Sequence, residues 1–269
     1  MVRLRRPTVL GTTPARQRSM ARGMASILVV LGAWQLSGVF LPPVYLSTPS
    51  RVAVGFFEVL ASGSLQPAFV LSLGELVIGV GISVIVGVGL GLIMGRIRAF
   101  DRALNSLVAF GNATPTIAVL PLMEVWFGFG SSARVSFIIA VSIWPLIINT
   151  LAGVHNLRPG FRDLGTSVGM TPWTQTWRIY VPGSMGYILA GARIAFALGI
   201  IGMVLAGQEI GQSGLGGLAE TYGTFFQTDR LVPVVLTSTG LAALLFGVLR
   251  MVQFMFFPWI RATAGGRRS

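Results

Sequence analysis

The chain has 269 residues, of which 53% are hydrophobic and 10% are charged, and its formal net charge is +12. Because a charged fraction of about 25% is usual in soluble domains, this composition excludes an ordinary soluble globular protein and indicates a membrane protein with several spans. All the basic residues except one histidine are arginines, and they gather in alternate loops, so the charge does not indicate nucleic-acid binding.

Six apolar runs approach or exceed the roughly 20 residues that a helix needs to cross a bilayer. We therefore predict an all-α polytopic membrane protein with six transmembrane helices. Their predicted ranges are 24–41, 68–94, 104–127, 135–154, 185–207 and 231–257.

The segments outside these spans divide the chain further. Residues 1–23 are rich in arginine and are expected to form a tail, residues 258–269 form a second tail, and residues 24–257 form the transmembrane domain. A short interfacial helix is expected at 52–60. The glycine-rich segment between the fifth and sixth spans is either a solvated loop or a docking surface for a soluble partner.

The distribution of arginine predicts the orientation of the spans. With a cytoplasmic N-terminus, fifteen arginines fall in inner segments and three, Arg51, Arg134 and Arg230, fall in outer ones. Arg193 and Arg250 lie within spans. Because positive residues are enriched in cytoplasmic loops, both termini are expected in the cytoplasm.

Several kinds of chemistry are missing from the sequence. There is no cysteine, and the one histidine, His155, cannot form a metal cluster alone and is expected at a helix end. Since there is no lysine, a P-loop lysine is impossible, and no Ser/His/Asp or HExxH pattern appears. The chain is therefore not expected to be an enzyme or to hold a metal or cofactor.

Small residues recur every four positions in two of the predicted spans. Such spacing places them on one side of a helix, where they allow close packing of a neighbouring helix. We predict tight helix packing, with close approach of a translocated solute as the alternative. The residues are Gly79, Ser83, Gly87, Gly91 and Gly95 in the second span and Gly191, Ala195 and Gly199 in the fifth.

The third predicted span contains two prolines, Pro115 and Pro121. Each proline removes a backbone donor and disturbs a carbonyl one turn earlier, so we expect two kinks facing protein or a water-filled cavity. Asn112 and Thr114 lie beside the first proline and Glu124 beyond the second, which indicates a span that faces the interior of the bundle.

Two carboxylates fall within predicted spans, Glu75 and Glu124. Because an ionised group is costly in lipid, each is a candidate functional residue, although each could also reach the interface or pair with a neighbouring helix. Together with Asn112 and Thr114 they are our candidates for the translocation pathway. A proton-coupled secondary transporter that uses one of these carboxylates is the alternative function, but no inverted repeat supports it.

The loop at about 155–182, between the fourth and fifth spans, is polar and capable of forming helices. Residues 161–168 predict a helix that ends at Gly169, and Thr171 and Pro172 are typical N-cap and first helical residues. The loop therefore predicts a helix, a tight turn and a second helix. Its apolar side chains suit docking onto another protein or, alternatively, onto lipid headgroups. These side chains are Leu164, Val168, Met170, Trp173 and Trp177.

The same loop resembles the EAA loop of binding-protein-dependent ABC importer permeases of the sulfonate/nitrate/taurine branch. The resemblance lies in DLGTSVG at 163–169, TPW at 171–173, VP at 181–182 and GAR at 191–193. PTIAVLPLMEVWFGFG and WPLIINTLAGV are similar to the third- and fourth-span signatures of that branch. Of the EAA triplet only the acid is kept, as Asp163, and a second proline near Pro182 is replaced by Met185 and Gly186.

The resemblance, which covers roughly 68–250, implies a type I ABC importer permease fold with a cytoplasmic coupling helix in a bacterial inner membrane. It implies a homodimer or paired permease, two cytoplasmic subunits that bind ATP, and an extracytoplasmic solute-binding protein. The residues implied in coupling to the ATPase are Asp163, Leu164, Gly165, Val168, Gly169, Met170 and Trp173. The solute is not specified.

Overall fold

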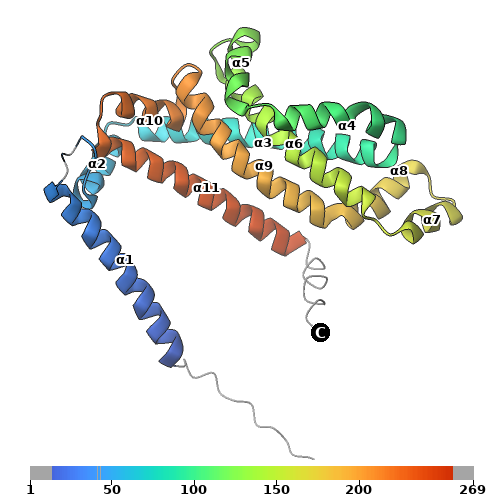
Figure 1. Cartoon of the computed structure of the whole chain (residues 1–269), viewed down its shortest axis with the longest axis horizontal. Helices are drawn as coiled ribbons and strands as arrows, with labels where there is room; N and C mark the ends of the chain where they lie inside the picture. Colours follow the sequence, from blue (N-terminus) through green and yellow to red (C-terminus); the bar gives the residue numbers. More distant parts are fainter. Residues whose placement is uncertain (1–13, 41, 43, 257–269) are drawn as a thin grey trace, which may run out of the picture.

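The computed structural model describes residues 14–40, 42 and 44–256, and the described residues form helices without a strand. Four long helices dominate the arrangement in Figure 1: α3 (Leu65–Arg96), α6 (Ser131–His155), α9 (Val181–Glu209) and α11 (Thr228–Phe256). Each is long and apolar enough to cross a membrane, α9 being counted with the short helices that precede it. The all-α polytopic fold is thus confirmed.

The third predicted span is not one kinked helix, which corrects our expectation for 104–127. Helix α4 (Arg98–Ala113) ends before Pro115, and the 3-10 helix η1 (Thr116–Val119) and α5 (Leu120–Phe127) follow at an angle of 103°. The prolines explain this break. Thr114 has the extended backbone favoured before proline, and Pro121 lies in the first turn of α5, where a missing N–H costs nothing.

This bent pair brings the number of spans in the described residues to four or five. The remaining predicted span corresponds to α1 (Pro14–Phe40), which begins ten residues before the predicted start. Arginine is a good helix former and proline suits a first helical turn, so the arginine-rich segment extends the helix. The count of six spans stays a prediction, and residues 1–13, 41, 43 and 257–269 lie outside the described residues.

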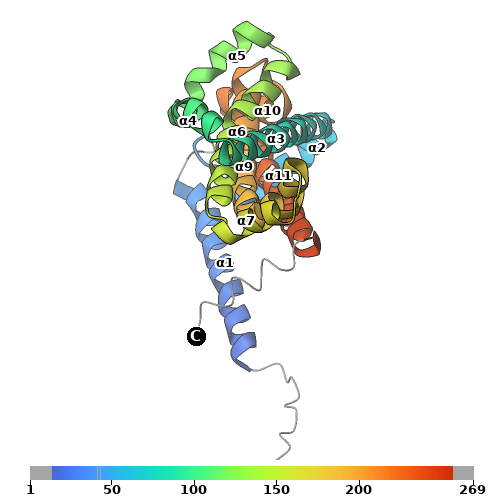
Figure 2. The same cartoon turned by 90° about the vertical axis from the view of Figure 1, so that its right-hand side faces the viewer.

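Short helices collect at the two ends of the bundle. Helices α2 (Pro49–Ala61) and α10 (Gly214–Thr224) lie at one end, whereas α7 (Pro159–Ser167) and α8 (Pro172–Gln175) lie at the other (Figure 1). The helix expected at 52–60 is therefore confirmed. The end-on view in Figure 2 shows α1 extending away from the body of the bundle.

The segment between the fifth and sixth spans forms the partly buried helix α10 rather than a solvated loop, and the alternative of a docking surface stays a prediction. The glycines of α10 permit the fold: a Cβ on Gly216 would lie 2.9 Å from the Cα of Gly207 in α9. Close contact between two backbones therefore replaces side-chain packing at this point.

The ladder of small residues on α3 faces α6. A Cβ on Gly91 would lie 2.6 Å from the Thr150 Cβ, and one on Gly87 would lie 2.8 Å from the Leu146 Cβ. Ser83 at the same register is fully buried and donates to the Ile139 carbonyl oxygen. The prediction of tight helix packing is therefore confirmed for this stripe.

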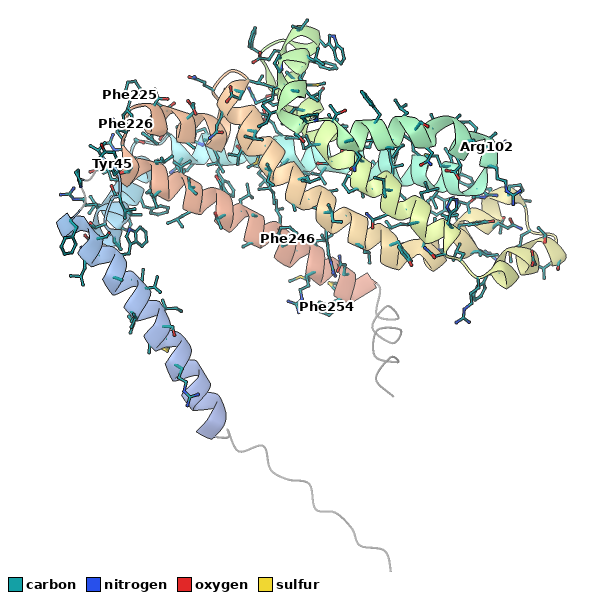
Figure 3. The ribbon with its side chains drawn as sticks, viewed as in Figure 1. Tyr45, Arg102, Phe225, Phe226, Phe246 and Phe254 are labelled. Atoms are coloured by element: carbon teal, nitrogen blue, oxygen red, sulfur yellow. The ribbon has the colours of Figure 1, made fainter. Side chains whose placement is uncertain are left out.

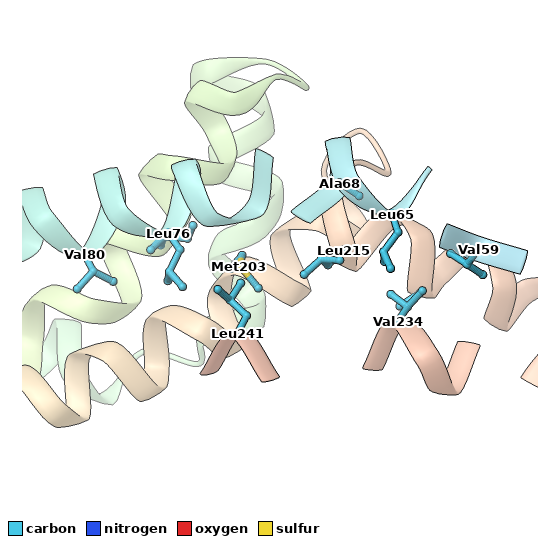
Figure 4. Packing of buried hydrophobic residues seen from close by; sticks show 11 residues of the cluster. Val59, Leu65, Ala68, Leu76, Val80, Met203, Leu215, Val234 and Leu241 are labelled. Atoms are coloured by element: carbon cyan, nitrogen blue, oxygen red, sulfur yellow. The ribbon is translucent and has the colours of Figure 1, made fainter. Parts of the chain in front are cut away.

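The main apolar cluster joins helices that are far apart in sequence. Figure 4 shows Leu76 of α3, Met203 of α9, Leu215 of α10 and Leu241 of α11 converging in one core. All four side chains are buried. Because burial of apolar groups is nondirectional, this cluster holds the helices together, whereas close contacts such as the glycine stripe of α3 fix how they fit.

Candidate coupling site and polar groups of the bundle

The loop between α6 and α9 contains a tight turn centred on Gly169, whose φ is +67°. The Gly169 N–H donates to the Thr166 carbonyl oxygen at 3.1 Å, and the Met170 N–H donates to the Gly165 carbonyl oxygen at 3.0 Å. These two bonds form a Schellman motif, in which the left-handed residue is most often glycine. The predicted end of the first helix at Gly169 is confirmed.

The second helix of the loop begins as predicted. The Thr171 side chain accepts a hydrogen bond from the Thr174 N–H at 3.3 Å, and Pro172 opens the first turn. The chain then continues through a π-helical turn, η2 (Thr176–Tyr180), directly into α9. Residues from Pro172 to Glu209 thus form a continuous helical segment of 38 residues that runs from this loop to the opposite end of the bundle.

Helix α7 (Pro159–Ser167) and the helical segment that begins at Pro172 form a hairpin around the turn at Gly169. Gly165 lies inside this hairpin rather than on its surface. It is buried, and a Cβ at this position would lie 2.8 Å from both Nε2 of Gln175 and Cδ1 of Ile179. Since Gln175 is itself buried, the two helices of the hairpin pack closely where they cross. Gly165 therefore sets the spacing of α7 from the following helix.

Arg96, at the C-terminus of α3, holds the second helix of the hairpin. Its Nη1 donates to the Pro172 carbonyl oxygen at 2.9 Å and also to the Thr176 hydroxyl. The guanidinium lies 4.9 Å from the centre of the Tyr180 ring. Sequence reasoning treated Arg96 only as one of the charges that indicate orientation. A single arginine next to a span carries no signal that would reveal partners about 80 residues away.

The surface of the hairpin is apolar and aromatic. Val168 is 60% exposed and Trp173 is 72% exposed, and the Trp173 ring meets Trp177 edge to face with 5.7 Å between centroids. Asp163 and Gly169 are also exposed, and Met170 is half-buried. The hairpin thus brings the predicted coupling residues together on one short element, although the side chain of Leu164 lies outside the described part of the chain.

Glu75 pairs with Arg134 in the interior of the bundle. Both side chains are almost completely buried, and Arg134 donates from Nη2 and Nε to the Glu75 carboxylate at 2.7 and 2.9 Å. Arg134 also donates to the Ile210 carbonyl oxygen and to the Ser131 hydroxyl. The pair therefore ties α3 to α6 and to the end of α9.

Arginine counting predicts that Arg134 lies in an outer segment, just before the fourth span. In the structure the helix begins at Ser131, so Arg134 lies in the first turn of α6, where the buried carboxylate compensates its charge. Pairing with a neighbouring helix was one of the alternatives left open for Glu75, and the structure provides that partner.

Asn112 and Thr114 line a cavity of about 300 Å³ at the break between α4 and η1. Trp144 of α6 and Leu198 of α9 complete its walls, and none of its lining side chains is charged. Glu124 lies farther along, on α5, and is not among the lining residues. The four candidate pathway residues thus fall in three separate places, and their role in transport stays a prediction.

A bundle of apolar spans, with an exposed helical hairpin continuous with one of them and a cavity at a broken span, is the architecture expected of a membrane permease. Residues 87–262 match the family described as "Binding-protein-dependent transport system inner membrane component", and the chain belongs to this family. It is the permease subunit of an ABC importer of the sulfonate/nitrate/taurine branch and a multi-pass inner-membrane protein.

Several permeases that are named for a transport system align with most of the chain. It is 25% identical over 249 residues to the taurine transport system permease protein TauC of Escherichia coli (strain K12), covering 90% of each chain. It is 28% identical to the riboflavin transport system permease protein RibX of Chloroflexus aurantiacus, covering 87% of this chain and 88% of that one.

A third relative transports a different solute again. The chain is 26% identical to the bicarbonate transport system permease protein CmpB of Synechococcus elongatus, with 88% of this chain and 87% of that one covered. All three names describe permeases of transport systems. These relatives support an ABC importer permease over the alternative of a proton-coupled secondary transporter.

Proposed function

We propose that this chain pairs with a second copy of itself, binds two separate cytoplasmic ATP-hydrolysing subunits, and receives its solute from an extracytoplasmic binding protein. Both termini then lie in the cytoplasm. The chain cannot hydrolyse ATP through a P-loop of its own, because it has no lysine. Family membership and the names of the relatives, which are permeases of transport systems, support this assignment.

The continuous helical segment from Pro172 to Glu209 is the observation that carries the proposal. A partner that binds the hairpin displaces one end of this segment when it moves. The helix then transmits the displacement to the interior of the bundle. Two arginines hold it at opposite ends: Arg96 at its start and Arg134 just after its last residue. Closure of the ATPase subunits would then switch the access of the pathway between the two sides of the membrane.

Within this scheme the ATPase contacts Asp163, Val168, Gly169 and Trp173, which are the exposed members of the predicted coupling set. Met170 and Gly165 act from below this surface, Gly165 by setting the spacing of the two helices. Leu164 is assigned to the same surface by its place in the loop.

The cavity lined by Asn112 and Thr114 forms part of the pathway in this proposal. Its neutral lining offers hydrogen bonds without fixed charge, which suits passage of solutes of differing charge rather than tight retention of one. The relatives' solutes, taurine, bicarbonate and riboflavin, differ in this way. The binding protein then supplies the choice of solute.

The test replaces Gly169 with aspartate in the full complex and measures both uptake and retention of the ATPase subunit. Gly63 provides a matched control, because it also has a positive φ (+72°), is exposed and has open space around its would-be Cβ. It lies after α2, at the opposite end of the bundle from the hairpin (Figure 1). Taurine, bicarbonate and riboflavin form the uptake panel.

Gly169→Asp is expected to insert normally, to lose the ATPase subunit on purification, and to reduce uptake at least tenfold. Gly63→Asp, which carries similar backbone strain, should retain both properties. Gly169→Asn, which tolerates a left-handed backbone, separates the effect of charge from that of conformation. Normal transport and normal ATPase binding in Gly169→Asp would show that the coupling assignment is wrong.

A further inference from the structure

A long apolar groove runs between α3 and the helical segment that begins at Pro172. It encloses about 880 Å³, and its walls include Val88 and Leu92 of α3, Val181 and Met185 of α9, and Trp177 of η2. Both walls belong to helices that are long and apolar enough to cross a membrane. The groove therefore lies between two elements that a bilayer would surround with hydrocarbon.

The length of the groove matches one leaflet of a bilayer. On α3 it extends from Val84 to Ile97, which at about 1.5 Å per residue is about 20 Å. Half the hydrocarbon core of a bilayer is about 15 Å thick, so the groove covers that depth and a few ångströms of the interface. One acyl chain therefore fits along it from end to end.

Positive charge gathers at only one end of the groove. Arg96 lines that end, and the exposed Arg98 and Arg178 are adjacent in sequence to groove residues. Among the described residues none of these three pairs with a carboxylate, because the ion pairs there involve Arg134, His155 and Arg230. Arg96 uses Nη1 for its contacts with Pro172 and Thr176, which leaves its Nε and Nη2 donors for an anion.

The two tryptophans add uncharged donors at the same end. Trp173 and Trp177 line the groove and are more than half exposed, and neither indole N–H donates a hydrogen bond within the described part of the chain. Tryptophan is enriched at membrane interfaces, where its ring meets apolar chains and its N–H meets headgroups. Arginines and tryptophans together thus favour a ligand with an apolar tail and an anionic head.

We propose that this groove binds one anionic phospholipid, with an acyl chain between α3 and α9 and the phosphate at Arg96 and Trp177. Basic pockets between transmembrane helices are suited to such headgroups. The lipid would pack against the same helical segment that α7 joins. It would leave Asp163, Val168 and Gly169 for a protein partner, with Trp173 at the border of the two surfaces. The proposal goes beyond the proposed function and needs only that the four long helices cross the membrane.

The test compares lipids retained by the full chain after purification in mild detergent with equal amounts of phosphatidylglycerol and phosphatidylcholine added. Native mass spectrometry reports the bound lipid and the number of chains together. The blocking variant is Gly89→Leu, because Gly89 lines the groove and a Cβ there meets nothing within 4 Å. Gly81→Leu is the matched control: Gly81 lies on the same helix with equally open space but outside the groove.

The wild-type chain is expected to retain one phosphatidylglycerol with at least tenfold preference over phosphatidylcholine. Gly89→Leu should reduce that retention about tenfold, whereas Gly81→Leu should leave it unchanged. Leucine is a better helix former than glycine, so neither variant is expected to lose its helix. Trp177→Phe and Arg98→Gln, which leave the groove open, should each reduce the preference severalfold.

Three outcomes would overturn the proposal. These are equal retention by Gly89→Leu and the wild type, equal binding of the two lipids, and a Gly89→Leu variant that keeps its lipid but loses association between copies of the chain. The last result would assign the groove to a second copy. None of these measurements uses ATP or a partner subunit, so their outcome does not affect the coupling proposal. In the same way, a failure of the coupling proposal does not change how these measurements are interpreted.

Discussion

Nε of Arg134 donates hydrogen bonds to both carboxylate oxygens of Glu75, at 2.9 and 3.1 Å, although the two residues are 59 positions apart in the sequence. Neither side chain is more than 7% exposed. The remaining donors of the guanidinium reach the Ile210 carbonyl oxygen and the Ser131 hydroxyl, so the charge is satisfied on every side. This pair fastens α3, α6 and the end of α9 at one point.

Removal of one member of the pair should be more damaging than removal of both. Breaking a buried ion pair costs about 3–5 kcal/mol because a charge is left uncompensated, whereas an apolar pair of similar volume is often neutral. We expect Arg134→Met and Glu75→Leu each to lower the melting temperature strongly, and the double variant to recover much of the loss. Thermal unfolding in one detergent measures this.

Uptake by the same double variant tests the pathway role of Glu75. If Glu75 serves the fold, the double variant transports at a rate close to that of the wild type. A double variant that is stable but does not transport would instead indicate that Glu75 takes part in the translocation pathway. Arg134→Lys is a useful companion, since lysine keeps the charge but lacks the planar fork.

The contact between α3 and α6 predicts a marked difference between glycines on one helix. Gly91→Ala places a Cβ 2.6 Å from the Thr150 Cβ and 2.9 Å from the Ile147 carbonyl oxygen, which are not free to move away. Overpacking of this kind costs about 1–3 kcal/mol. Gly74→Ala, where the Cβ meets nothing within 4 Å, should be neutral or slightly stabilising.

Melting temperatures of the two alanine variants in the same detergent provide the comparison. Equal stability of Gly91→Ala and Gly74→Ala would show that the stripe does not pack against α6 as described. Gly91→Ser adds little volume beyond alanine and is expected to behave like Gly91→Ala.

Arg96 should be required for coupling even in a well-folded protein. Its hydrogen bonds to Pro172 and Thr176 and its position over Tyr180 fix the start of the helical segment, and hydrogen bonds from a charged donor contribute about 1.5–3 kcal/mol. We expect Arg96→Lys to retain ATPase binding but to transport less solute per ATP hydrolysed. Hydrogen exchange in residues 159–180 should increase at the same time.

Arg98→Lys is the control for that experiment, because Arg98 is exposed and has no carboxylate partner among the described residues. It should leave hydrogen exchange and the ratio of uptake to ATP hydrolysis unchanged. Unaltered exchange in Arg96→Lys would contradict the role of Arg96 as an anchor of the hairpin.

Exposed aromatic residues mark the other end of the molecule. Figure 3 shows Tyr45, Phe225 and Phe226 at the end opposite Arg102, and all three are largely exposed. Arg102, one of the arginines expected in the cytoplasm, and these aromatic side chains therefore lie at opposite ends of the bundle. This polarity agrees with the orientation predicted from arginine counting and leaves that orientation a prediction.

The local features of this protein were readable from its sequence. Gly169, Thr171 and Pro172 predicted the turn and the second helix because caps depend on residues within a few positions of one another. The apolar runs predicted α3, α6, α9 and α11 because a bilayer requires their length and composition. Small residues at every fourth position of α3 also predicted a packing stripe, although this spacing did not indicate which helix would pack against it.

Only the tertiary structure decided which distant groups meet. The Glu75–Arg134 pair and the contacts of Arg96 join residues 59 to 80 positions apart, and no local pattern distinguishes such a partner from a solvated charge. The break of the third span likewise depended on whether neighbouring helices would support a bend at Pro115. The sequence alone determined the class of protein and the helical hairpin before α9, since length, polarity and capping act locally. Long-range packing placed the charges, because their burial is favourable only where the fold supplies a partner.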